Sequence, residues 1–269
     1  MRDESARRGA GWRLGPACIA LLGAAAVFGP SVAPHDPFAL AGPALIPPSA
    51  AFPLGTDALG RDLLSALLFG ARTSAIVSVS VTILASIVGT CIGMVAGFAG
   101  GLRDDMLMRA TEVVQVIPRF FLAIVIIAVF GPGLDRLILV LTLTSWPALA
   151  RLVRGEVVAM RDLDYVRAAD ALGATRARIL RVQLLPNLRP TIIVAACLLF
   201  AQVLLLDAGL AFLGLGDPSR ISWGQLAAQA QGYLRIAWWL ALFPGAAITL
   251  SVVGVHLVAD AWTSAARRG

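Results

Sequence analysis

The chain has 269 residues, of which 58% are hydrophobic and only 14% are charged, and its formal net charge is +6. A soluble globular protein of this length needs more polar surface than this composition supplies. The composition therefore excludes a soluble globule and predicts an all-α protein embedded in a membrane.

Six membrane-spanning helices are expected. Crossing about 30 Å of hydrocarbon takes about 20 apolar residues. Uncharged stretches of that length occupy residues 14–35, 73–102 and 236–259. Weaker candidates lie at about 110–131, 134–153 and 190–213, where the first contains Glu112, Pro118 and Arg119. Pro118 removes one backbone hydrogen bond, so it is expected to kink its helix.

All 22 basic residues are arginine. If the N-terminus is cytoplasmic and the chain crosses six times, sixteen arginines fall on the cytoplasmic side, and Arg119 is embedded. Those left outside are Arg61, Arg72, Arg136, Arg220 and Arg235. This distribution satisfies the positive-inside rule and predicts that both termini are cytoplasmic. The basic charge then reflects topology, and nucleic acid is not an expected partner.

The sequence divides into four segments. Residues 1–35 are expected to form a cytoplasmic N-terminus and a retained first transmembrane helix, and residues 263–269 a cytoplasmic tail. Residues 36–72 are expected to form an external connector followed by an interfacial helix, and residues 73–262 a core of five helices. The connector follows from a proline-rich stretch that cannot form helix. The interfacial helix follows from leucines at helical spacing opposite Arg61, Asp62 and Arg72.

Small and polar residues mark two kinds of position within the spans. Gly89, Gly93 and Gly97 recur every four residues and predict a face for close helix packing, within the chain in preference to a second subunit. Gln115, Gln202 and Asp207 are candidate residues of a transport pathway. Each of the three is equally consistent with an interfacial or packing group.

One long stretch, residues 151–189, carries too many charges to lie in lipid, so it is expected to be a cytoplasmic loop. Asp164 is predicted to cap a helix that runs to Leu172, and Gly173 to end it. Thr175 is predicted to cap a second helix, which stops at Pro186. Its apolar stripe is Ile179, Val182 and Leu185.

Within this loop, Ala168-Ala169, Gly173 and Leu185-Pro186 have the spacing of the EAA loop in permease subunits of ABC importers, which the stretch 164–187 resembles. Arg167 stands where that motif has glutamate, and Gln183 where it has isoleucine; an Arg167–Asp170 contact is expected to offset the first change slightly. The resemblance implies a coupling helix that docks on an ATPase. The residues it assigns to docking are Asp164, Tyr165, Arg167, Ala168, Ala169, Asp170, Leu172, Gly173, Leu185 and Pro186.

Two further stretches, PLGTDALGRDLLSALLFGART and AFLGLGDPSRISWGQL, resemble the dipeptide, oligopeptide and nickel permeases, in their second-permease branch. The resemblance runs from about residue 53 to 262. It implies a type I ABC importer permease fold with six transmembrane helices and a coupling helix between spans four and five, in the bacterial inner membrane. It also implies four kinds of partner: a homologous second permease, two ATPase subunits, an extracytoplasmic solute-binding protein, and membrane lipid. The solute is expected to be a peptide or a related small solute such as a nickel chelate.

The chain is not expected to be an enzyme. A Walker A loop needs a lysine at the nucleotide phosphates, and this sequence has no lysine. ATP and Mg are therefore assigned to the partner subunits, and no cofactor, metal site or catalytic residue is expected in this chain. The GxGD form of residues 214–217 suggests an aspartyl protease, but Asp217 and Asp207 are expected near the same outer boundary and not together at membrane depth. The alternative kept for function is an ion-coupled secondary transporter.

Overall fold

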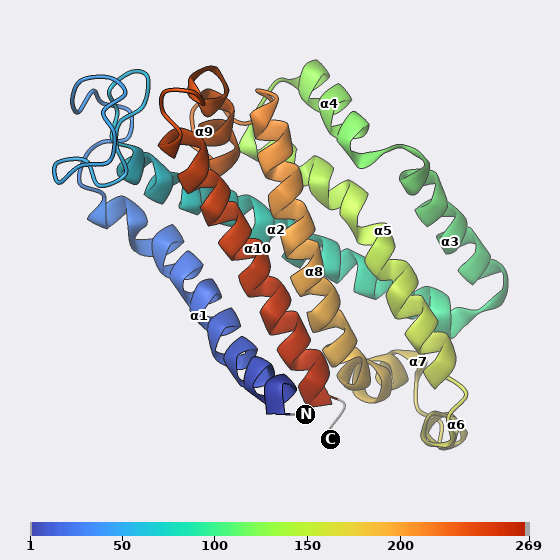
Figure 1. Cartoon of the computed structure of the whole chain (residues 1–269). Helices are drawn as coiled ribbons and strands as arrows, with labels where there is room; N and C mark the ends of the chain where they lie inside the picture. The colour runs from blue at the N-terminus through green and yellow to red at the C-terminus, as the bar shows by residue number, and fades with distance from the viewer. Residues whose placement is uncertain (1, 267–269) are drawn as a thin grey trace.

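The computed structural model describes the backbone of residues 2–266 and the side chains of residues 14–263. All regular structure in this part of the chain is helical, which confirms the predicted all-α class (Figure 1). The principal helices are α1 (Arg2–Val32), α2 (Leu63–Ala99), α3 (Gly101–Val116), α4 (Arg119–Phe130), α5 (Leu134–Met160), α6 (Asp164–Ala171), α8 (Leu185–Phe212), α9 (Trp223–Gln229) and α10 (Trp239–Ala266). Between α6 and α8 lie α7 (Arg176–Arg178) and a π-helical segment (Ile179–Leu184), and a 3₁₀ turn (Ala230–Tyr233) follows α9.

Five of these helices are long and apolar enough to cross a membrane, and α3 with α4 makes a sixth if the two are one broken span. The axes of α3 and α4 differ by 73° across a break at Ile117 and Pro118. The ring of Pro118 and its missing N–H explain why the helix stops there. The kink predicted at Pro118 is confirmed, and the span count agrees with the predicted six in this sense.

The first external segment differs from its prediction. No separate interfacial helix precedes span two, because α2 is one continuous helix of 37 residues that starts at Leu63. Asp62 is not part of an exposed polar face. It is fully buried, and its carboxylate accepts the backbone N–H of Ser65 as the N-cap of α2. The amphipathic and apolar stretches merge because nothing between them breaks the helix.

The ends of the bundle also differ in detail. α1 begins at Arg2 and α10 continues to Ala266, so most of the predicted cytoplasmic ends are helical. Residues 1 and 267–269, part of the predicted N-terminal segment and tail, lie outside the described residues. The start of α1 and the end of α10 lie at the same end of the bundle as α6, while α9 and residues 33–62 lie at the other (Figure 1). We call these the α6 end and the loop end.

The three regularly spaced glycines of α2 lie against α5. A Cβ atom at Gly89 would sit 2.8 Å from the carbonyl oxygen of Trp146, and one at Gly97 would sit 2.8 Å from the Cβ of Val157. At Gly93 the added atom would meet Ala150 and Val153. Because α2 has no side chain at these positions, the two backbones approach closely and gain dispersion contacts, which drive helix association in lipid.

At the loop end, residues 33–62 form no helix, as their prolines predicted. They fold around Thr56, whose hydroxyl accepts the N–H of Ile46 at 2.8 Å and donates to the carbonyl of Pro43 at 2.8 Å. The carbonyl of Thr56 accepts the indole N–H of Trp239 in α10 at 3.2 Å. Prolines lack a donor but keep a carbonyl acceptor, so a proline-rich stretch can still be fixed by side chains.

Thr56→Val tests this arrangement, because it keeps the shape of a fully buried side chain and removes its hydroxyl. The N–H of Ile46 and the carbonyl of Pro43 then lose their partner, which is expected to cost about 2 kcal/mol locally. Limited proteolysis within residues 33–62 is expected to speed up by about tenfold or more, since 1.4 kcal/mol is a factor of ten. Thr56→Ser keeps the hydroxyl and serves as the control. Equal cleavage of the valine and serine variants would contradict the assignment.

Candidate functional site

The charged stretch between α5 and α8 forms a helical hairpin, residues 164–187, at the α6 end of the bundle (Figure 1). Its first helix begins one position earlier than predicted. Leu163 is the N-cap in an extended conformation, and its carbonyl accepts the N–H groups of Val166 and Arg167. Asp164 is therefore not the cap but the first helical residue. Its carboxylate lies in the first turn, where the helix dipole favours negative charge.

Gly173 ends α6 as predicted. Its φ is +80°, in the left-handed region that glycine adopts without strain. The N–H of Gly173 donates to the carbonyl of Asp170 at 2.9 Å, and that of Ala174 to the carbonyl of Ala169 at 3.1 Å. These two bonds are the Schellman arrangement that closes a helix C-terminus. The chain consequently reverses within a few residues, and the direction of α6 is set by this glycine.

The second arm begins as predicted and ends differently. The Thr175 side chain accepts the N–H of Arg178 at 3.3 Å and caps the arm. The arm does not stop at Pro186, because residues 176–212 form one helical run through a π-helical segment. Pro186 lies at the start of α8, directly after this segment. The wider turns of the π segment let the helix continue past the proline ring and its missing donor.

One apolar cluster attaches the hairpin to the membrane helices. Val166 of α6, Ile179 and Leu184 are 2%, 0% and 0% exposed. They pack with residues of α2, α5 and α8, namely Met94, Leu149, Val153, Val157 and Leu188. The predicted stripe was wrong at Val182, which is 57% exposed, because the π segment shifts the helical register.

Ile179→Ala is expected to loosen this attachment by about 2–5 kcal/mol, because it removes a fully buried side chain from a packed cluster. Hydrogen exchange of the α6 amides measures the loss as faster exchange confined to the hairpin. Val182→Ala in the same segment is the matched control and should leave the exchange rates unchanged. Similar rates in the two variants would show that Ile179 does not hold the hairpin.

Most of the remaining surface of α6 is exposed, and the hydroxyl of Tyr165 accepts a hydrogen bond from the side-chain amide of Asn187 in α8 at 3.3 Å. Ala168, Ala171 and Leu172 are exposed, the last at 87%, whereas Ala169 is half-buried and packs against the apolar cluster. Also exposed are Asp164, Tyr165, Arg167, Asp170 and Gly173. Leu185 and Pro186, which were assigned to the same docking set, are instead half-buried at the start of α8. The structure thus presents a small apolar face with charged flanks.

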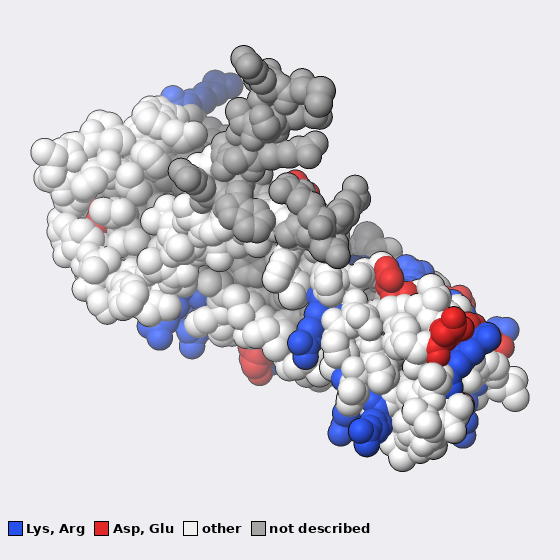
Figure 2. Space-filling view, turned by 90° about the horizontal axis from the view of Figure 1, so that it is seen from below, with Lys and Arg blue, Asp and Glu red and all other residues white. Residues whose placement is uncertain are grey.

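Charges around α6 are mixed. Arg167 contacts Asp162 at 3.6 Å and not Asp170 as predicted, because Asp162 lies just before the helix within reach of its side chain. Both side chains are about two-thirds exposed, so this ion pair contributes little stability. Figure 2, which views the α6 end, shows arginine side chains spread over this face with acidic ones among them. An acidic or a basic partner could each find complementary charge here.

The three candidate pathway residues do not come together. Gln115 is half-buried in the last turn of α3, and Gln202 is exposed on α8. Asp207 is 2% exposed and lies beside Ser74 of α2. Its Oδ2 atom has no partner among the described residues. Asp207 therefore lies inside the contact between α8 and α2, where it faces protein and not an open channel.

A junction that sequence reasoning missed lies at residues 222–224. The indole N–H of Trp223 donates to the carbonyl of Leu67 at 2.9 Å, and its backbone N–H to the hydroxyl of Ser74 at 3.4 Å. A Cβ atom at Gly224 would lie 2.5 Å from the carbonyl oxygen of Ala208. The Ser-Trp-Gly sequence, noted only as part of a resemblance, thus joins α2, α8 and α9 at the loop end.

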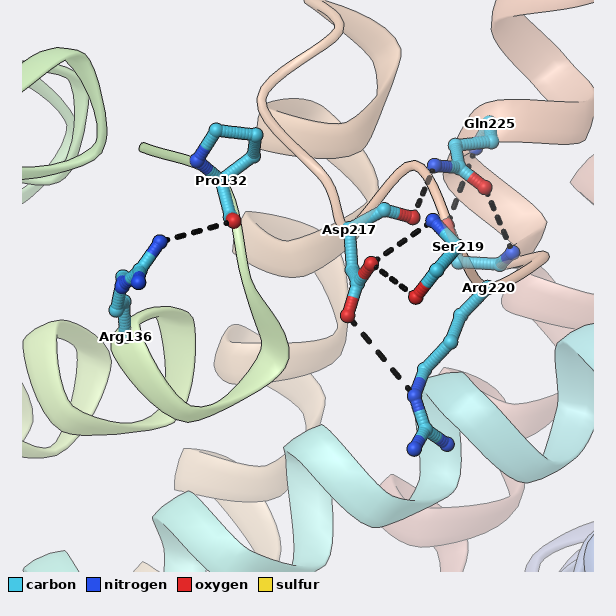
Figure 3. A network of polar contacts seen from close by, with 7 residues as sticks. Pro132, Arg136, Asp217, Ser219, Arg220 and Gln225 are labelled. Carbon is cyan, nitrogen blue, oxygen red and sulfur yellow. Dashed lines mark hydrogen bonds and ion pairs between the residues drawn. The ribbon is translucent and has the colours of Figure 1, made fainter. Parts of the chain in front are cut away.

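The GxGD stretch forms a loop held by Asp217 (Figure 3). The Asp217 carboxylate accepts the N–H and hydroxyl of Ser219 at 2.9 and 2.6 Å and lies 3.9 Å from the guanidinium of Arg220. Burial opposes ionisation, but the hydrogen bonds from Ser219 and Leu134, together with Arg220, hold the pKa of Asp217 below its usual value. These contacts account for Asp217 as the residue that shapes the loop.

Comparison with known proteins places the chain in a family. Residues 89–268 match the family model described as binding-protein-dependent transport system inner membrane component. The chain is 39% identical over 243 residues to the di/tripeptide transport system permease protein DppC of Pseudomonas aeruginosa, covering 87% of this chain and 80% of that one. It is 38% identical to the probable D,D-dipeptide transport system permease protein DdpC of Escherichia coli, covering 87% and 79%. It is 34% identical to the oligopeptide transport system permease protein OppC of Bacillus subtilis, covering 80% and 70%.

A solved structure supports the same fold. A chain in the inward-facing MetNI methionine ABC transporter matches with a TM-score of 0.61, covering 74% of this chain and 94% of that one, at 20% identity. This likeness concerns the arrangement of helices, and the family follows from the sequence matches. The chain belongs to the family of binding-protein-dependent transport system inner membrane components.

Proposed function

We propose that this chain is the membrane permease subunit of an ATP-driven ABC importer and forms a solute pathway with a second, homologous permease. The observation that carries the proposal is α6. It is a short helix attached to the bundle through Val166, and most of its surface is exposed. The long helices of the chain, in contrast, are apolar enough to cross a membrane. A short exposed helix such as α6 is suited to dock in a groove on another protein.

The partners follow from what this chain lacks and what it presents. It has no lysine, hence no Walker A loop, so ATP with its Mg is assigned to two separate ATPase subunits. The family description implies an external binding protein that delivers the solute. The arginine distribution supports an orientation in which α6 and both termini are cytoplasmic. Residues 33–62 and α9 then face the binding protein.

The mechanism is alternating access driven through the hairpin. When the ATPase subunits close, the uncovered face of α6 moves with them, and Gly173 fixes the angle at which α6 meets the second arm. Val166, Ile179 and Leu184 pack in one cluster with residues of α2, α5 and α8 and pass the motion to these helices. Packed clusters of this kind transmit displacement instead of absorbing it. The spans then shift against the second permease, and the pathway opens to one side at a time.

Peptides are the proposed solute. The relatives compared above are named for transport of di- and tripeptides, D,D-dipeptides and oligopeptides. A nickel chelate or another small solute is the second choice, because the binding protein selects the solute before the permease receives it.

Affinity purification of the tagged chain from its own membrane tests the assembly. The expected result is a complex with a homologous permease and two ATPase subunits, to which a binding protein attaches. Mass spectrometry of the ligand released from that binding protein is expected to find peptides. A chain that purifies alone and still transports would refute the proposal, whereas a nickel chelate as the ligand would correct only the solute.

A further inference from the structure

An ion pair outside the hairpin connects α3 to α5. The guanidinium of Arg154 donates from Nε and Nη2 to the two carboxylate oxygens of Asp104, each at 2.7 Å. The Asp104 side chain is 9% exposed and that of Arg154 38%. Two parallel, charge-assisted bonds of this kind fix both distance and direction between the helices. Neither residue belongs to the docking face or to the candidate pathway.

A second contact, between α5 and α2, lies close to this ion pair. Arg161, at the end of α5, donates from Nη1 to the carbonyl of Gly97 in the last turn of α2 at 2.9 Å. Gly100 and Gly101 follow with φ values of +64° and +55°, and this turn leads α3 back alongside α5. The turn between α2 and α3 is thus bonded to the α6 end of α5 from two sides.

Asp104 is one of the few buried residues of α3. Among the described residues of this helix only Asp104 and Thr111 are buried. Leu102, Met106 and Val116 are 82%, 71% and 78% exposed. Apolar contacts between helices gain little hydrophobic free energy in lipid, because lipid is as apolar as the neighbouring helix. A bidentate ion pair therefore determines the position of α3 in a way that its apolar contacts cannot.

Arg154 is also close to the hairpin along the chain and in the packing. Val153 and Val157, which flank it on α5, are fully buried in the cluster with Val166 and Ile179. The hairpin and the segment of α5 that holds Arg154 are therefore packed in one cluster. Beyond α3, the break at Pro118 separates α4 by a 73° bend. The α6 end of α5 and the start of α3 thus form one unit that ends at this break.

We propose that the Asp104–Arg154 pair makes α3 move together with α5 and the hairpin, so that ATPase-driven displacement of α6 is delivered to the broken span α3–α4. This inference rests on the proposed function. Asp104 and Arg154 are positioning residues, because they act through the helix that they hold. Pro118 marks the hinge at which the delivered motion changes the angle between α3 and α4.

Coupling of the assembled transporter in proteoliposomes tests the pair. Asp104→Asn and Arg154→Lys are expected to lower the amount of solute imported per ATP hydrolysed by about tenfold, with thermal unfolding of the assembly close to wild type, because each keeps a hydrogen bond but loses the bidentate charge pair. Asp105→Asn removes the exposed neighbouring acid and is the matched control. The exchanged pair Asp104→Arg with Arg154→Asp should recover much of the coupling, which a purely local defect would not. Coupling equal to that of the control in both single variants would overturn the proposal.

A cross-link tests joint movement directly. In an assembly freed of other cysteines, including Cys18, Cys91 and Cys197, the chain carries Asp104→Cys and Arg154→Cys. A short bis-maleimide that joins the two positions is expected to restore coupled uptake that the unlinked double variant has lost. Blocked uptake after linking would show that α3 and α5 must separate, and would overturn the proposal. If the wild-type assembly shows no ATP-driven uptake at all, the proposed function fails. Hydrogen exchange of the α3 amides then still tests the pair, because exchange should be faster in Asp104→Asn than in the wild type if the pair holds this helix.

Discussion

Gly93→Leu is expected to unfold or misassemble the helix bundle, with a loss of about 3 kcal/mol or more in the free energy of unfolding. A Cβ atom at this position would meet the carbonyl oxygen of Ala150 and lie 2.9 Å from the Cβ of Val153. These are backbone or backbone-adjacent atoms of α5 and cannot turn away. The remaining atoms of leucine would force α2 and α5 apart along a seam that also contains Gly89 and Gly97.

Gly155→Leu on α5 provides the matched control, because an added Cβ atom there finds nothing within 4 Å. This variant should be as stable as the wild type or slightly more stable, since leucine favours a helix by somewhat less than about 1 kcal/mol over glycine. Thermal unfolding of the detergent-solubilised chain compares the two. Equal unfolding temperatures for the two variants would mean that the α2–α5 seam is not tightly packed at Gly93.

Gly173→Pro is expected to reduce solute uptake by about tenfold or more in the assembled transporter while ATP hydrolysis continues. Proline fixes φ near −65° and has no N–H. It can reproduce neither the φ of +80° nor the bond from Gly173 to the carbonyl of Asp170. The second arm of the hairpin would then meet α6 at a different angle, and ATPase motion would no longer reach the buried cluster.

Insertion and folding of the Gly173→Pro variant should remain normal, because Gly173 is exposed and has no atom within 4 Å of an added Cβ. Gly173→Asn serves as the control, since asparagine tolerates the left-handed region better than other residues with a Cβ. It should retain coupled uptake. If the proline variant also retains it, the direction of α6 does not matter to transport.

Local residue chemistry was enough to predict the helices, the break at Pro118, the stop at Gly173 and the cap at Thr175. Each of these depends on a property of one residue or its near neighbours, such as a missing donor or a tolerated φ. The start of α6 was displaced by one residue, because Leu163 takes the extended conformation and uses its backbone where an aspartate side chain was expected. The start of α2 was missed because the two predicted stretches form one continuous helix, and no helix-breaking residue separates them.

Contacts between distant parts of the chain could not be predicted in this way. The Asp104–Arg154 pair joins residues 50 positions apart, and the bond between Trp239 and Thr56 spans 183 positions. Helical periodicity places a side chain on a face but does not say which other helix that face meets. Asp207 illustrates the limit: its polarity was equally consistent with a pathway residue and with a packing group, and only the structure shows that it is buried beside Ser74. Most of the residues predicted to dock on an ATPase are exposed on α6, whereas Ala169, Leu185 and Pro186 are half-buried, and the docking itself stays a prediction.

The central claim, that this chain imports solute by the energy of ATP, is tested by uptake in proteoliposomes. The assembly of the tagged chain with its copurified partners is reconstituted with ATP inside or without it, and with or without a proton or sodium gradient. Labelled peptide delivered by the binding protein is expected to accumulate only when ATP and Mg are present, whatever the gradient. Uptake that persists without ATP and follows an ion gradient would contradict the account and identify a secondary transporter.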